Sequence, residues 1–78
     1  MASVASSKQF AVLYEQAADG GVGAYVPDLP GCFSVGATRE EAERNIKDAI
    51  ALYLEELHAS GQPTPEPRTK IGYVESAA

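Results

Sequence analysis

The sequence feature that most constrains the fold is a rigid corner at residues 27–32, which read PDLPGC. Pro27 and Pro30 each hold their own φ at about −65° and push the preceding residue toward extended geometry. Pro30 and Gly31 suit the two central positions of a type II turn, because glycine tolerates the positive φ that the second position requires. The corner therefore predicts a sharp connection of fixed shape between two short strands.

One long helix is predicted directly after Thr38. In the capping box that Thr38 and Glu41 form, the Thr38 hydroxyl accepts the N–H of Glu41, and the Glu41 carboxylate accepts the N–H of Thr38. Apolar residues recur at helical spacing and define one apolar face: Ala42, Ile46, Ala49, Ile50, Tyr53 and Leu57. Gly61 and Pro63 supply the stop, so we expect a helix at residues 39–60.

Short apolar stretches predict strands at residues 10–15, 22–26 and 32–35. The first two are joined by the turn sequence Asp19-Gly20-Gly21. After the helix and a proline-rich connector, residues 69–74 predict a last strand. We therefore expect an α+β fold of order β-β-β-α-β, an antiparallel meander with a parallel fourth strand beside the first, in spatial order 3-2-1-4. A right-handed crossover places the helix on one sheet face, which leaves the other face uncovered.

Length and charge limit the classes of function. The 78 residues make one domain, with a mobile segment expected at 1–8, the folded unit at 9–75 and a mobile tail at 76–78. The net charge of −5 argues against direct binding to nucleic acid, which needs basic residues to neutralise phosphates. The sequence lacks a signal-peptide pattern, a pair of cysteines and an apolar run of about 20 residues, so we expect a cytoplasmic protein. A core this small favours a homo-oligomer, a dimer or larger.

Two motifs carry a family resemblance. Residues 25–32, YVPDLPGC, followed by residues 36–42, GATREEA, resemble the HicB-like antitoxin family over about residues 10 to 74. The resemblance implies a truncated ribonuclease-H-like fold. It also implies an antitoxin that binds a small basic ribonuclease toxin of the HicA type and occludes its RNA-binding or active surface. Many members append a DNA-binding domain, and since this sequence ends at Ala78 we expect none here.

The likeness to ribonuclease H raises the question of catalysis. Two-metal nucleases need several carboxylates that converge on one point. The first predicted strand has no central acidic residue, while Asp19 has a turn role and Glu41 a capping role. We therefore expect no enzyme, and no catalytic, metal-binding or cofactor-binding residues.

Partner binding is the more plausible role for the acidic residues. The residues predicted to contact a basic toxin are Glu15, Asp19 and Asp28, which would steer the encounter, and Leu29 and Phe33, which would add apolar contact. The corner at residues 28–30 has an alternative, purely structural role as a turn. The chain as a whole has an alternative role as a stand-alone oligomeric module whose protein or ligand partner is unrelated to any toxin.

Two leucines are predicted to lie in an oligomer contact. Leu13 alternates with Phe10, Val12 and Tyr14 and points to the sheet face that the helix leaves uncovered. Leu52 points about 120° away from the centre of the helix's apolar face. Both would be covered by a second copy of the chain.

Overall fold

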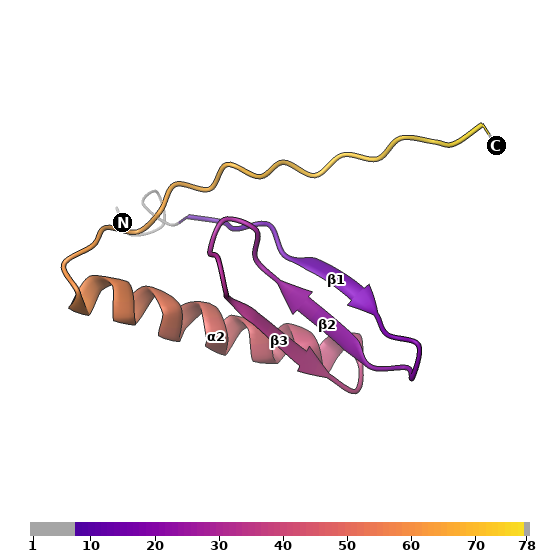
Figure 1. The fold of residues 1–78 in the computed structure, drawn as a ribbon, viewed down its shortest axis with the longest axis horizontal. Helices are drawn as coiled ribbons and strands as arrows, with labels where there is room; N and C mark the ends of the chain where they lie inside the picture. The colour runs from indigo at the N-terminus through magenta and orange to yellow at the C-terminus, as the bar shows by residue number, and fades with distance from the viewer. Residues whose placement is uncertain (1–7, 78) are drawn as a thin grey trace, which may run out of the picture.

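The computed structural model describes residues 8–77, so the mobile segment predicted at residues 1–8 falls almost wholly outside the described range. Three strands precede one helix: β1 (Leu13–Gln16), β2 (Val22–Tyr25), β3 (Phe33–Gly36) and α2 (Arg39–Ala59) (Figure 1). The strands form an antiparallel sheet in the order β1-β2-β3. The three strands and the helix that the sequence predicts are confirmed, with bounds shifted by a few residues.

The two strand connections have the turn chemistry that their sequences predict. In the β1–β2 hairpin, the Asp19 carboxylate accepts the N–H of Gly21 at 3.0 Å, and Gly20 has a φ of 95°. In the corner, the Cys32 N–H donates to the Leu29 carbonyl at 2.9 Å, and Gly31 has a φ of 84°. Those two observations at the corner are the marks of a type II turn with Pro30 in its first central position.

The helix begins and ends where local signals place its caps. The Thr38 hydroxyl accepts the N–H of Glu41 at 3.1 Å, as predicted. The Glu41 carboxylate, however, accepts the N–H of Ala37 rather than that of Thr38, so the return bond lies one residue earlier than expected. At the other end, Gly61 has a φ of 81°, and the N–H of Gln62 donates to the Leu57 carbonyl at 2.9 Å, which is the Schellman ending of a helix.

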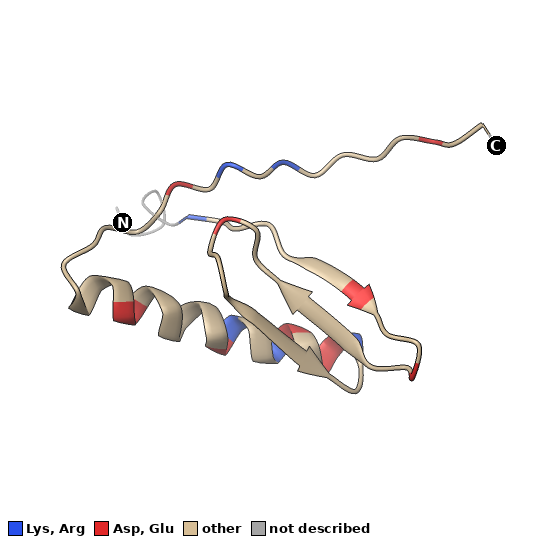
Figure 2. Cartoon of the chain, in the orientation of Figure 1, with Lys and Arg blue, Asp and Glu red and all other residues tan. Residues whose placement is uncertain are grey.

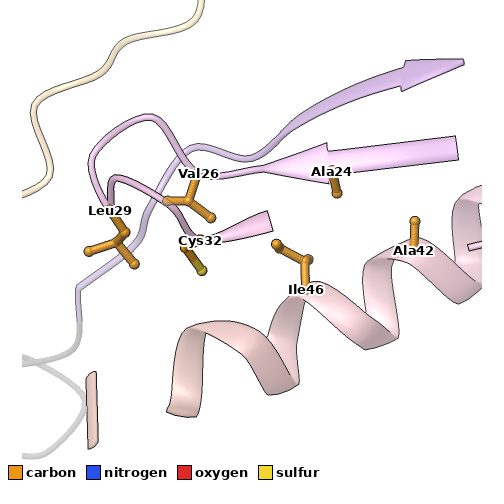
Figure 3. Close-up of a cluster of buried hydrophobic side chains, with 6 residues drawn as sticks. All are labelled: Ala24, Val26, Leu29, Cys32, Ala42 and Ile46. Atoms are coloured by element: carbon orange, nitrogen blue, oxygen red, sulfur yellow. The ribbon is translucent and has the colours of Figure 1, made fainter. Parts of the chain in front are cut away.

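The core lies between α2 and one face of the sheet (Figure 3). Six residues from the sheet, the corner and the helix are buried: Ala24, Val26, Leu29, Cys32, Ala42 and Ile46. The helix packs against β3 and β2. Close packing depends on Gly36, where an added Cβ would lie 2.5 Å from the backbone nitrogen of Ala42. The start of α2 can rest on β3 only because this position has no side chain.

The predicted fourth strand at residues 69–74 is wrong. No strand follows α2 in the described residues, and the sheet order is β1-β2-β3 rather than 3-2-1-4, although the α+β class holds. The backbone N–H groups of Arg68 and Thr69 donate to one Asp28 oxygen at 2.9 and 3.0 Å, so the start of this segment is fixed to the corner rather than to a strand. α2 is therefore no crossover between parallel strands.

Candidate partner-binding surface

The sheet has one face that the helix does not cover. Ala24 is buried under α2, and because side chains alternate along a strand, its neighbours Gly23 and Tyr25 point to the opposite side. The strand register places the side chains of that side in two rows, Leu13–Tyr25–Phe33 and Glu15–Gly23–Val35. We call these six residues the open sheet face.

Large apolar side chains dominate the open sheet face. Phe33 is 67% exposed and Val35 is 66% exposed, and Tyr25 is also exposed. The hydrogen bond from Val26 N–H to Cys32 carbonyl makes the next pair, Tyr25 and Phe33, a non-hydrogen-bonded pair, whose side chains lie especially close. A contiguous apolar patch of this kind on a small protein is typical of a surface that another molecule covers.

One end of the open sheet face is acidic. A hollow of about 710 Å³ at the hairpin end is lined by residues that include Glu15, Asp19, Glu41, Gly23 and Val35. Glu15 and Asp19 are exposed. Between residues 9 and 38 the sequence has three acidic residues and no lysine or arginine, and Figure 2 shows the basic residues on α2 and on the terminal segments. The sheet therefore presents apolar and negative groups together.

Asp28 lies in the corner with its carboxylate already engaged within the chain. Its Oδ2 accepts the N–H groups of Thr69 and Arg68, and its Oδ1 accepts the Thr69 hydroxyl at 2.9 Å. These bonds, led by the one from the Thr69 N–H, lower the pKa of Asp28 below its ordinary value of 3.8 against a smaller opposing effect of desolvation. In this structure Asp28 fastens the C-terminal segment to the corner, and its contact with a partner stays a prediction.

The remaining predicted residues fall in three different environments. Leu29 is fully buried in the core, so its side chain is not on the surface (Figure 3). Phe33 belongs to the open sheet face, as does the half-buried Leu13. Leu52 is exposed on α2, in the layer opposite the open sheet face. The structure thus brings Glu15 and Phe33 onto one surface with Asp19 at its end, and it separates Leu29 and Leu52 from them.

Two residues of this surface were missed by sequence reasoning. Tyr25 and Val35 are exposed large side chains on the open sheet face. Residues 22–26 and 32–35 are predicted strands, and successive side chains of a strand point to opposite faces of the sheet. If Ala24 and Ser34 face the helix, Tyr25 and Val35 must face the other side. The alternation of side chains along these two predicted strands could therefore have identified Tyr25 and Val35 as surface residues.

Cys32 and the acidic side chains within residues 8–77 are of the types that can act as metal ligands or nucleophiles. Over residues 8–77 no group of three or more His, Cys, Asp or Glu side chains is placed to hold a metal ion. Cys32 is buried and its burial raises the pKa of the thiol, which makes it a small core side chain rather than a nucleophile. No helix in this range is long and apolar enough to cross a membrane.

Comparison with known proteins identifies the family. Residues 10–77 match the family model described as the HicB-like antitoxin of bacterial toxin–antitoxin systems. The chain belongs to the HicB-like antitoxin family. Among curated proteins, a UPF0150 protein of Synechocystis is 51% identical over 57 residues, which span 73% of this chain and 72% of that protein.

Solved structures of HicB-like antitoxins share the fold. The N-terminal domain of the antitoxin HicB from Burkholderia pseudomallei superposes with a TM-score of 0.71 at 28% identity, over 78% of this chain and 72% of that one. A chain of the HicA3–HicB3 toxin–antitoxin complex superposes with a TM-score of 0.64 at 29% identity, over 80% and 72% of the two chains. The family resemblance read from residues 25–32 and 36–42 is confirmed.

Proposed function

We propose that this HicB-like antitoxin neutralises a small basic ribonuclease toxin by covering the toxin's RNA-binding or active surface with its open sheet face. The observation that carries the proposal is the combination of exposed Tyr25, Phe33 and Val35 with the acidic hairpin end. A surface that binds RNA must be basic, so a partner with the opposite charge and apolar contacts is suited to block it. The solved HicA3–HicB3 complex supports a protein toxin as the partner.

The apolar and acidic groups have different roles in this proposal. Phe33 and Tyr25 would supply most of the binding free energy, because aromatic side chains near the centre of an interface are the usual hot spots. Glu15 and Asp19, at the edge of the patch, would act chiefly on the association rate, since charges at an interface rim steer the encounter. Occlusion requires no catalytic group on the antitoxin.

The test is an inhibition and binding assay with any small basic protein that is encoded beside this chain's gene. Phe33→Ala should weaken binding by at least about 30-fold, mainly through faster dissociation, as expected for a hot spot worth about 2 kcal/mol. Glu15→Lys should slow association and make the rate less sensitive to salt. Binding kinetics by surface plasmon resonance and RNA cleavage by the toxin provide the two measurements.

Leu52→Ala is the matched control, because it removes an exposed apolar side chain from the helix layer. It should leave toxin binding unchanged. If Phe33→Ala and Glu15→Lys bind and inhibit like the unmodified chain, the open sheet face is not the toxin interface. If no basic protein is encoded nearby or recovered with the chain, a stand-alone binding module becomes the better account.

A further inference from the structure

The C-terminal segment changes character at Thr69. Before that residue the segment is docked: Lys8 pairs with Glu66 at 2.9 Å, and Asp28 accepts three hydrogen bonds from Arg68 and Thr69. From Lys70 to Ala77 every residue is exposed, although the stretch contains Ile71, Tyr73 and Val74. Tyr73 is 93% exposed and Val74 is 96% exposed, so large apolar side chains stand in water.

The extended segment also makes the molecule unusually long. Figure 1 shows it leaving the corner and projecting past the end of the sheet. The radius of gyration is 14.7 Å, whereas a compact domain of this length has about 11.5 Å. Residues 70–75 are extended, contain β-forming residues and are not a strand of their own sheet, so they have the form of a strand that another chain could pair with.

The sheet has one edge suited to receive such a strand. The Ala17 N–H donates to the Gly21 carbonyl at 2.7 Å, so Ala17 and Gly21 are a hydrogen-bonded pair of the β1–β2 hairpin. Hydrogen-bonded and non-hydrogen-bonded pairs alternate along an antiparallel ladder. The N–H and carbonyl groups of Tyr14 and Gln16 therefore point away from β2, toward the outer edge of β1. In the described range no strand lies beside this outer edge of β1. The opposite edge is partly closed, because Asn45 on α2 donates to the outward Val35 carbonyl at 2.8 Å.

We propose that residues 70–75 of one copy add as a strand to the β1 edge of a second copy, and that the second copy returns the same strand in a two-fold dimer. Each copy has both the segment and the edge. A two-fold exchange therefore pairs both segments with both edges, and the assembly stops at two copies. The proposed contact lies along the outer edge of β1 and does not cover Tyr25, Phe33 or Val35 of the open sheet face.

The side chains of the segment fit this position. Ile71 and Tyr73 share one side of an extended chain, and Lys70 and Val74 share the other. α2 packs against β3 and β2, so Val12 on the helix-facing side of the β1 edge is only half buried and can be covered by Ile71 or Tyr73. The neighbouring Tyr14 is also half buried, with the Arg39 guanidinium 4.0 Å from the centroid of its ring. Lys70 and Val74 then fall on the side of the open sheet face.

Charge and length are also compatible with the exchange. Lys70 would approach the side of β1 that carries Glu15, so one pair of opposite charges can form across the contact. The six residues from 70 to 75 match the usual length of a strand and exceed the four residues of β1. The free edge, the length of the segment and the approach of Lys70 to Glu15 therefore favour a second copy of this chain as the partner.

The test is a proline scan of residues 70–75 in the full chain, with the dimer dissociation constant measured by sedimentation velocity. In an edge strand, alternate N–H groups point to the neighbouring strand, and a proline is tolerated only where the N–H points outward. Three alternate prolines should raise the dissociation constant by at least about tenfold, and the three intervening ones should change it by less than about threefold. Ile71→Ala and Tyr73→Ala are controls that remove the side chain but keep the backbone N–H, so comparison with the prolines at these positions separates the two effects.

Hydrogen exchange supplies the second measurement. The amides of Tyr14 and Gln16 should exchange slowly in the dimer and faster on dilution, because the added strand protects them. A chain that stays monomeric at micromolar concentrations would overturn the proposal. A dimer that tolerates all six prolines, or that is weakened equally by all of them, would place the contact on another surface, with Leu13 or Leu52 as the next candidates.

Discussion

Replacing Gly36 with alanine should destabilise the fold because it adds a methyl group where helix and sheet meet. The added Cβ would lie 2.5 Å from the Ala42 nitrogen and 3.0 Å from its Cα, and all of these atoms belong to backbone. A flexible side chain cannot relieve this contact. The first turn of α2 would have to retreat by about 0.9 Å to restore a separation of 3.4 Å.

The cost follows from two effects of that retreat. Overpacking of this kind costs about 1–3 kcal/mol. The shift also weakens the hydrogen bond from the Ser34 hydroxyl to the Ala42 carbonyl, 3.1 Å in the structure, which adds about 1 kcal/mol. A loss of about 2–4 kcal/mol is a large part of the total stability of about 4–12 kcal/mol expected for a chain of this length. It should lower Tm by at least about 10 °C.

The assay is urea and thermal unfolding followed by circular dichroism at one fixed chain concentration, because association would make Tm depend on concentration. Gly23→Ala in β2 is the matched control, since its added Cβ would lie 3.9 Å from the nearest atom, an ordinary contact. It should be neutral or slightly stabilising. If the free energies of unfolding of the two variants agree within about 0.5 kcal/mol, the close packing of α2 on β3 inferred from this structure is refuted.

Three further predictions concern the cap, the C-terminal anchor and catalysis. Thr38→Ala should lower the free energy of unfolding by about 1 kcal/mol in chemical denaturation, while Thr38→Ser, which keeps the hydroxyl, should restore most of it; equal midpoints for both would argue against the cap. Because hydrogen bonds led by the one from Thr69 lower the pKa of Asp28 below 3.8, the anchor should be formed above that pH and lost as the pH falls through the lowered value. The Thr69 amide should report this loss by NMR, and Asp28→Asn should remove the pH dependence. Finally, the purified chain with magnesium or manganese should leave RNA, DNA and RNA–DNA hybrids intact; cleavage that disappears in Glu15→Gln would contradict the interpretation of a binding protein.

The structural role of Asp28 affects how partner binding should be tested. A charge reversal at Asp28 removes the acceptor that holds Thr69 and Arg68, so any change in toxin binding would be mixed with release of the C-terminal segment. Asp19 has a similar structural bond to the Gly21 N–H, whereas Glu15 lies exposed at the end of β1. Glu15 is therefore the acidic residue best suited to isolate electrostatic steering.

The sequence by itself determined the elements whose signals are local. The caps at Thr38 and Gly61, the hairpin turn at Asp19 and the type II turn at Pro30 each depend on hydrogen bonds or dihedral angles within about four residues. Such patterns are visible in a single sequence, and they locate α2 and the three strands. The family motifs have the same local character, since they combine turn, cap and apolar positions.

Only the tertiary structure decided the features that join distant parts of the chain. Leu29 is fully buried because the corner folds over the end of the core, although its neighbours in sequence are turn residues. Residues 69–74 have the composition of a strand, yet a strand forms only where a neighbouring edge is within reach, and Asp28 holds Thr69 at the corner across 41 positions of sequence. The partners of Asp28 and the packing at Gly36 depend on the fold as a whole, which is why no local pattern predicted them.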